Sequence, residues 1–134
     1  MLKKTFFAAV SMLAIASSAC VVETRTTPID ITGDVIVDWT ISGAKAPSLC
    51  TQSSARTLVI DVFNNSGTTV GSYEQRCEAF ATTITLNDGL YSATATLLDG
   101  GGVARTTTVS LGQLDIIAGT SITVPIDFPS SSFF

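Results

Sequence analysis

The chain has 134 residues, of which 46% are hydrophobic and only 13% are charged, so it is long enough to bury one globular core. Seven lysines and arginines stand against eleven acids, and histidine is absent. The missing histidine removes the commonest general base and the commonest metal ligand. The acidic balance argues against nucleic acid as a partner.

The first 19 residues have the layout of a secretory signal peptide. Two lysines precede an apolar run over residues 6–15, and small residues follow at positions 17–19. The apolar run is shorter than the roughly 20 residues that a helix needs to cross the hydrocarbon core of a membrane. We therefore predict that residues 1–19 form a signal-peptide helix that is removed, and that they are not a permanent membrane span.

The stretch SSAC at residues 17–20 resembles the lipobox of bacterial lipoproteins. Ala19 and Cys20 match that pattern, whereas Ser17 stands where the family prefers Leu, Val or Ile. The resemblance implies that Cys20 becomes the lipidated N-terminus of the mature protein. The alternative is an ordinary signal peptidase site, because Ser17 and Ala19 also satisfy the small-x-small rule. A free N-terminal thiol in an oxidising compartment would be a liability, which favours lipidation.

Residues 20–134 retain five basic residues and all eleven acids, which gives a net charge of −6. A polybasic attachment to anionic lipid is therefore excluded, and an anchor has to consist of two or three acyl chains. In enteric lipoproteins, an aspartate directly after the lipidated cysteine resembles a signal for retention in the inner membrane. Here Val21 occupies that position after Cys20. We accordingly expect attachment to the outer membrane. The periplasmic side and the cell-surface side of that membrane both stay as alternatives.

If Cys20 carries lipid, Cys50 and Cys77 remain as an even pair in an exported chain, which predicts a structural disulfide. The chain-entropy model gives such a loop about 3 to 4 kcal/mol of stabilisation. A redox or metal-binding role lacks support, because the sequence has no CxxC spacing and no histidine.

From residue 34 onward, apolar and polar residues alternate with a period of two, which is typical of strands with one buried face. Strands are predicted over residues 34–42, 57–63, 69–73, 79–86, 90–98, 103–111 and 120–128, with a loop over residues 43–55. The NDG sequence at 87–89 predicts a hairpin turn, and Pro125 assigns the last strand to a sheet edge. This pattern predicts an all-β fold, an antiparallel β-sandwich of about seven strands.

The run NDGLYSATATLLDGGGVARTTTVSL resembles the GxYxVxVxLxDxxGxVV pattern of bacterial Ig-like, carboxypeptidase-regulatory-like and transthyretin-like modules. The matching residues are Gly89, Tyr91, Leu97, Asp99 and Val103. Trp39, Cys50 and Cys77 also resemble arrangements in predicted lipoproteins that carry one such sandwich. Trp39 precedes both cysteines, however, whereas the tryptophan of antibody-type domains lies between them, so no immunoglobulin domain proper is predicted. The resemblance covers about residues 33–128 and implies a fold without a shared catalytic site.

The predicted organisation is thus a signal peptide (1–19), a lipidated tether (20–33), a sandwich domain (34–128) and a flexible C-terminal tail (129–134). No serine lies in a GxSxG or SxxK pattern, and neither Cys50 nor Cys77 has a histidine partner, so we predict no enzyme activity. No cofactor is expected apart from the covalent lipid on Cys20.

The acids offer one candidate for a metal site. Asp30, Asp34 and Asp38 recur at intervals of four, and on a strand the last two could converge with Asp61 or Asp99 on calcium. The alternative is a solvated strand face, which we favour because the fixed calcium-loop spacings are missing. The sequence therefore predicts no metal ion.

Aromatic residues supply the remaining candidates for binding. Trp39 and Tyr91 fall on apolar strand faces and are predicted to pack in the core, whereas the position of Tyr73 is open. Phe133 and Phe134 end the chain, where they either pack over one end of the sandwich or dock onto a partner, for example by extending a neighbouring sheet. Tyr73, Phe133 and Phe134 are therefore our candidate contacts for a ligand or partner.

Together these features predict an exported, lipid-anchored β-sandwich protein of the bacterial envelope with a structural or protein-interaction role. The alternative is a surface module that binds a carbohydrate or another small ligand. The expected partners are the membrane, through the lipid, and an envelope or surface protein.

Overall fold

The computed structural model describes residue 29 and residues 31–134. The predicted signal peptide, Cys20 and Asp30 lie outside these residues. The described part forms seven strands and three short helical turns: β1 (Thr32–Ile41), α1 (Pro47–Gln52), β2 (Thr57–Asn64), β3 (Thr69–Arg76), η1 (Cys77–Ala79), β4 (Ala81–Asn87), β5 (Gly89–Leu98), β6 (Val109–Ile116), β7 (Ser121–Phe128) and η2 (Ser130–Ser132). The predicted all-β sandwich is confirmed.

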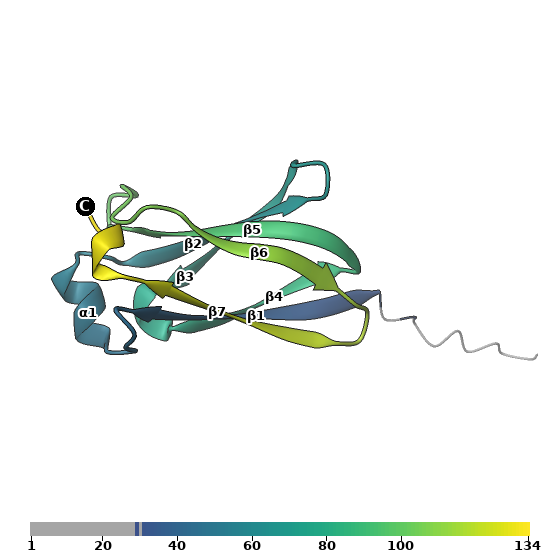
Figure 1. Cartoon of the computed structure of the whole chain (residues 1–134), viewed down its shortest axis with the longest axis horizontal. Helices are drawn as coiled ribbons and strands as arrows, with labels where there is room; N and C mark the ends of the chain where they lie inside the picture. The colour runs from purple at the N-terminus through teal and green to yellow at the C-terminus, as the bar shows by residue number, and fades with distance from the viewer. Residues whose placement is uncertain (1–28, 30) are drawn as a thin grey trace, which may run out of the picture.

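The strands form two stacked sheets (Figure 1), one of three strands in the order β4-β1-β7 and one of four in the order β3-β2-β5-β6. Four strand pairs of the described residues are antiparallel: β1 with β4, β2 with β3, β2 with β5, and β5 with β6. The pair of β1 with β7 is parallel. The parallel pair differs from the antiparallel expectation. It arises because the chain leaves β6 in one sheet and enters β7 in the other, where β7 starts at the same end of the sandwich as β1.

The core lies between the sheets and follows the period-two pattern of the sequence. In β1, buried and half-buried residues alternate without interruption over all ten positions. The fully buried residues with the largest side chains are Trp39, Phe128, Leu58, Ile60 and Leu97. Burial of these inward faces is the main force that holds the two sheets together.

The strand β7 lies at an edge of the three-stranded sheet, as Pro125 predicted. Pro125 is paired with Asp38 of β1 and lacks an amide hydrogen, so it fits a strand with a neighbour on one side only.

Several boundaries differ from the sequence prediction. The loop over residues 43–55 contains α1, which starts at Pro47, a residue suited to the first turn of a helix. The sixth strand begins at Val109 instead of residue 103 and continues to Ile116. Gly112 has a φ of 77°, and the register with β5 shifts beside it, so the buried face passes from Leu111 to Leu114. This bulge interrupts the alternation beyond residue 111, where the predicted strand ended.

Residues 129–134 pack against the sandwich, which corrects the prediction of a flexible tail. The Thr107 amide donates to the Ser132 carbonyl at 2.8 Å, and the Phe134 amide donates to the Arg105 carbonyl at 3.1 Å. Ser132 is only 6% exposed. These hydrogen bonds satisfy backbone groups that a mobile segment would leave to water, and they fix η2 over one end of the domain.

The sandwich has two different ends, which we name by the residues found there. The proximal pole contains the start of β1 at Thr32 and the turn between β4 and β5. The distal pole contains α1, η1, the start of β2 at Thr57 and the C-terminal turn η2. Figure 1 shows the proximal pole at the right and the distal pole at the left. Within the described residues, no helix is long and apolar enough to cross a membrane.

Candidate functional site

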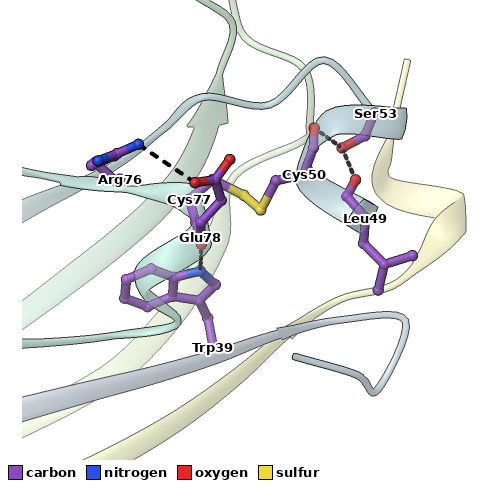
Figure 2. Close-up of a disulfide and its surroundings, with 7 residues drawn as sticks. All are labelled: Trp39, Leu49, Cys50, Ser53, Arg76, Cys77 and Glu78. Carbon is purple, nitrogen blue, oxygen red and sulfur yellow. Dashed lines mark hydrogen bonds and ion pairs between the residues drawn. A yellow bond between two sulfur atoms is a disulfide. The ribbon is translucent and has the colours of Figure 1, made fainter. Parts of the chain in front are cut away.

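A disulfide joins Cys50 of α1 to Cys77 of η1 at the distal pole, as the sequence predicted (Figure 2). The two Cα atoms are 6.0 Å apart, and both cysteines are fully buried. The bond ties α1 to the connection between the two sheets, since β3 and β4 lie on either side of η1 in different sheets.

Trp39 contacts the backbone of one of the two disulfide-bonded cysteines. Its indole Nε1 donates a hydrogen bond to the carbonyl oxygen of Cys77 at 3.0 Å (Figure 2). The Trp39 ring lies 6.3 Å from the ring of Phe80 between centroids, with planes tilted by 42°. Because Trp39 is completely buried, the prediction that it packs in the core is confirmed.

The end of α1 is fixed by polar contacts. The Ser53 hydroxyl donates to the Leu49 carbonyl at 2.7 Å, and the Arg105 Nε donates to the Ser53 carbonyl at 3.3 Å. The second contact connects α1 to the segment that follows β5. The surface between these elements is therefore held in a defined shape.

A groove of about 680 Å³ opens at this surface. We call it the distal groove; it is lined by Cys50, Thr51, Ser54, Ala55, Arg56, Thr57, Arg76, Glu78, Asp99, Gly100 and Gly101. These residues come from α1 and its exit, the start of β2, the end of β3, η1 and the turn after β5. The lining is predominantly polar and contains two cations and two carboxylates.

The two arginines of the distal groove differ in their contacts. Arg76 forms an ion pair with Glu78 at 3.5 Å, and both side chains face solvent (Figure 2). Arg56 makes no side-chain hydrogen bond or ion pair with any described residue. A Cβ on Gly100 would lie 3.9 Å from the Cγ and Nε atoms of Arg56, so the arginine side chain runs alongside this turn. Arg56 is thus positioned but electrostatically unpaired.

Asp99 shapes the turn on the other side of the groove. Its Oδ1 atom accepts hydrogen bonds from the amides of Gly101 and Val103, both at 2.9 Å. The hydrogen bond from Val103 lowers the pKa of Asp99 below its ordinary value of 3.8, and Gly101 and Arg105 act in the same direction against desolvation. The Asp99 carboxylate is therefore ionised at neutral pH and stabilises the turn.

A smaller cleft of about 340 Å³ lies at the proximal pole. We call it the proximal cleft; it is lined by Asn64, Asn65, Gly67, Tyr91, Ser92 and Gln113. The Asn64 Oδ1 atom already accepts from the amides of Ser66 and Thr68, both at 3.0 Å. Tyr91, predicted to be a core residue, is half-buried against the core.

The three aromatic residues predicted as contacts lie apart from these hollows. Tyr73 of β3 and Phe133 are half-buried and pack against the core, whereas Phe134 is 74% exposed. None of the three lines the distal groove or the proximal cleft. Of the two alternatives for the tail, packing over one end of the sandwich holds for Phe133.

The aspartates considered for calcium do not converge. Asp34 accepts a hydrogen bond from the Thr85 hydroxyl at 2.7 Å, and Asp38 forms an ion pair with Lys45. Both lie on β1, whereas Asp61 lies on β2 in the other sheet. Among residues 29 and 31–134, no three Asp, Glu, Cys or His side chains are grouped as metal ligands would be.

The sequence reasoning missed Arg56 and Arg76 because they lie 20 positions apart and match no motif. Thr57 is the register partner of Arg76 across β2 and β3, which brings the two arginines to the same end of one sheet. A register prediction for this hairpin would have been needed to find them.

The fold and the distal groove define an all-β sandwich with a buried disulfide and a polar surface groove. No known protein family matches the sequence, and no curated protein matches it. The fold is similar to part of a leucine-rich repeat protein from Bacteroides thetaiotaomicron VPI-5482, with a TM-score of 0.50 and 18% identity over 75% of this chain. A TIE protein from Bacillus anthracis matches 72% of this chain with a TM-score of 0.48 and 13% identity. This chain spans only 12% and 16% of those two proteins.

Proposed function

We propose that this protein is an exported, non-enzymatic lipoprotein of the bacterial outer membrane, anchored through Cys20, with a structural or protein-interaction role. The finer resemblance to Ig-like, carboxypeptidase-regulatory-like and transthyretin-like modules is part of this proposal.

The separation of the two poles is the observation that carries the proposal. The chain enters β1 at the proximal pole, whereas the disulfide, α1 and the C-terminal turn lie at the opposite end (Figure 1). The 12 residues from Cys20 to the start of β1 at Thr32 span at most about 40 Å. An anchor at Cys20 thus holds the proximal pole towards the membrane and leaves the distal pole available to partners.

The anchor is tested on the native chain and a Cys20→Ser variant, both expressed in a bacterial host. We expect the native protein to enter the detergent phase and to show a mass that equals residues 20–134 plus a diacylglyceryl group and an N-acyl chain, less two hydrogens for the disulfide. The Cys20→Ser variant keeps its disulfide and enters the aqueous phase. A native protein without acyl mass, recovered in the aqueous phase, contradicts the proposal.

Two exposed features at or near the distal pole support contact with a protein. Phe134 leaves a large apolar side chain in solvent, and β3 is an exposed edge strand that ends there. Crosslinking in intact cells is expected to trap one fixed envelope protein, with less product for Phe134→Ala than for the matched proximal variant Leu90→Ala. Equal yields for the two variants contradict a distal contact.

The two hollows favour a second candidate function, the binding of a carbohydrate or another small polar ligand. The distal groove falls within the volume range of about 300 to 1,000 Å³ that is usual for small-molecule sites. Isothermal titration calorimetry with neutral and acidic oligosaccharides tests this second function directly. No heat of binding for any sugar would count against it.

A further inference from the structure

We infer that the distal groove binds the carboxylate or phosphate group of an acidic saccharide between the guanidinium groups of Arg56 and Arg76. This inference rests on the second candidate function and specifies its ligand class. It does not depend on the lipid anchor.

The backbone places the two arginines on neighbouring strands at one end of the sheet. Arg56 directly precedes β2, and Arg76 is the last residue of β3. The Cys77 amide donates to the Arg56 carbonyl at 2.9 Å, which fixes the separation of the two chains at this point. Both side chains line the distal groove, so an anion in the groove meets two cations.

The charges of these arginines are available to a ligand. Arg56 has no charged or hydrogen-bonded partner among the described residues, and Arg76 has only the solvent-facing Glu78 at 3.5 Å. A guanidinium group presents several N–H donors in one plane and can bind a carboxylate or phosphate with two parallel hydrogen bonds. An anion that enters the groove can accept hydrogen bonds from any of the guanidinium N–H groups of Arg56. It has to compete with Glu78 for the guanidinium group of Arg76.

The rest of the lining indicates that the anion belongs to a polar, hydroxyl-rich molecule. The hydroxyl groups of Thr51, Ser54 and Thr57 line the groove and make no hydrogen bond with another described residue. Only Cys50 and Ala55 contribute small apolar side chains, and the lining has no aromatic ring. A volume of about 680 Å³ is large enough for an extended ligand that carries the anionic group. A sugar with an acidic substituent meets these conditions.

The basic side chains of the described residues are concentrated at this pole, where Asp38, Glu78, Asp99 and Asp127 also lie. The four basic side chains of the described residues, Lys45, Arg56, Arg76 and Arg105, all lie at the distal pole. The remaining surface is acidic and repels anions. Within the groove, Asp99 stays ionised while its Oδ1 atom accepts hydrogen bonds from the amides of Gly101 and Val103, so Asp99 and Glu78 both oppose an anionic ligand, and Glu78 alone is paired with an arginine of the groove.

The experiment measures binding of two probes, trigalacturonate and glucose 6-phosphate, to the full-length chain purified in detergent. Calorimetry at about 0.15 M salt, where the Debye length is about 8 Å, gives the affinities, and methyl-esterified trigalacturonate and glucose are the neutral controls. We expect saturable binding of at least one anionic probe and none of the neutral forms. The carboxylate and phosphate arms together show which group the site prefers.

Three substitutions locate the site, and they have different expected directions. Arg56→Gln weakens binding by about tenfold or more, because a charged hydrogen-bond donor is lost. Glu78→Gln strengthens binding several-fold, because it removes the competing carboxylate and releases Arg76. Lys45→Gln is the matched control: it removes a positive charge at the same pole but outside the groove, and affinity stays within about twofold.

Circular dichroism melts establish that each variant is folded, and exposed substitutions of this kind change stability little. The inference is overturned if neither anionic probe binds, or if Lys45→Gln weakens binding as much as Arg56→Gln does. Equal binding of the neutral sugars also overturns it, although the ligand-binding function itself would then survive.

Discussion

The two poles of the sandwich differ in charge and in how they are held together. The distal pole contains a disulfide, a buried tryptophan, four basic side chains and a polar groove that two of the basic side chains line. At the proximal pole, Asp34, Asp88 and Asp115 have no basic neighbour within the described part of the chain, and Ile31, Leu90 and Ile117 remain exposed. The distal pole of the sandwich is thus cross-linked by a disulfide and carries charges of both signs. The proximal pole, which directly follows the N-terminal segment, is acidic.

This difference suggests a division of roles. Rigid elements position binding groups more precisely than mobile loops do, and the irregular segments of the distal pole are fixed by covalent and hydrogen bonds. The proximal pole has close backbone packing but no such cross-link. The following predictions test whether the two poles differ in stability and in charge as the structure indicates.

The largest effect is expected from Trp39→Ala at the distal pole. The substitution leaves a cavity in the core and deprives the Cys77 carbonyl of its donor, so unfolding should become easier by about 4 kcal/mol. Trp39→Phe is the matched variant; it keeps an aromatic ring and should lose about 1 to 2 kcal/mol. Urea denaturation measures both. Equal losses for the two variants would mean that packing contributes little here.

Removal of the disulfide in a Cys50→Ala, Cys77→Ala double variant should cost about 3 to 4 kcal/mol, because the bond closes a loop with a sequence separation of 27 residues. Hydrogen exchange on this variant should show faster exchange in α1 and η1, with little change at the turn between β4 and β5. A uniform increase across both poles would indicate that the disulfide does not act locally.

Gly33→Ala tests the close packing of the proximal pole. A Cβ on Gly33 would lie 2.6 Å from the Ile117 carbonyl oxygen and 2.9 Å from the Ile116 Cγ2 atom. The backbone has to shift, at a cost of about 2 kcal/mol. Gly100→Ala is the distal control, because its Cβ meets only Arg56 side-chain atoms at 3.9 Å or more, and stability should change by about 0.5 kcal/mol or less. Thermal melts that rank these two variants in reverse would contradict the structure.

The smallest effect concerns Asp99 and pH. Since the folded-state pKa of Asp99 lies below its ordinary value of 3.8, the stability that it provides is present above that value and is lost as pH falls through the folded-state pKa. The native protein should therefore melt at a higher temperature than Asp99→Asn at pH 7, and the difference should shrink below pH 3.8. Carbon-13 NMR titration of Asp99 measures the pKa itself. A pKa at or above 3.8 contradicts the prediction.

Much of the sandwich could be predicted from the sequence. The alternation in residues 34–42 identified the buried face of β1, and Pro125 identified an edge strand, because these are local consequences of the strand period and of a missing amide hydrogen. Cys50 and Cys77 were predicted to pair because they were an even pair in an exported chain. The lipidation of Cys20 and the contacts of Tyr73, Phe133 and Phe134 with a partner stay predictions.

The distal groove and the asymmetry of the poles could not be predicted in this way. Arg56 and Arg76 meet because of the register between β2 and β3, and the parallel pairing of β7 with β1 depends on where the chain crosses between sheets. The bulge at Gly112 and the packing of residues 129–134 likewise depend on contacts between segments distant in the sequence. Periodicity along a chain determines which face of each strand is buried. Tertiary packing alone decides which strand ends meet, since it balances chain connectivity, register and burial over the whole domain.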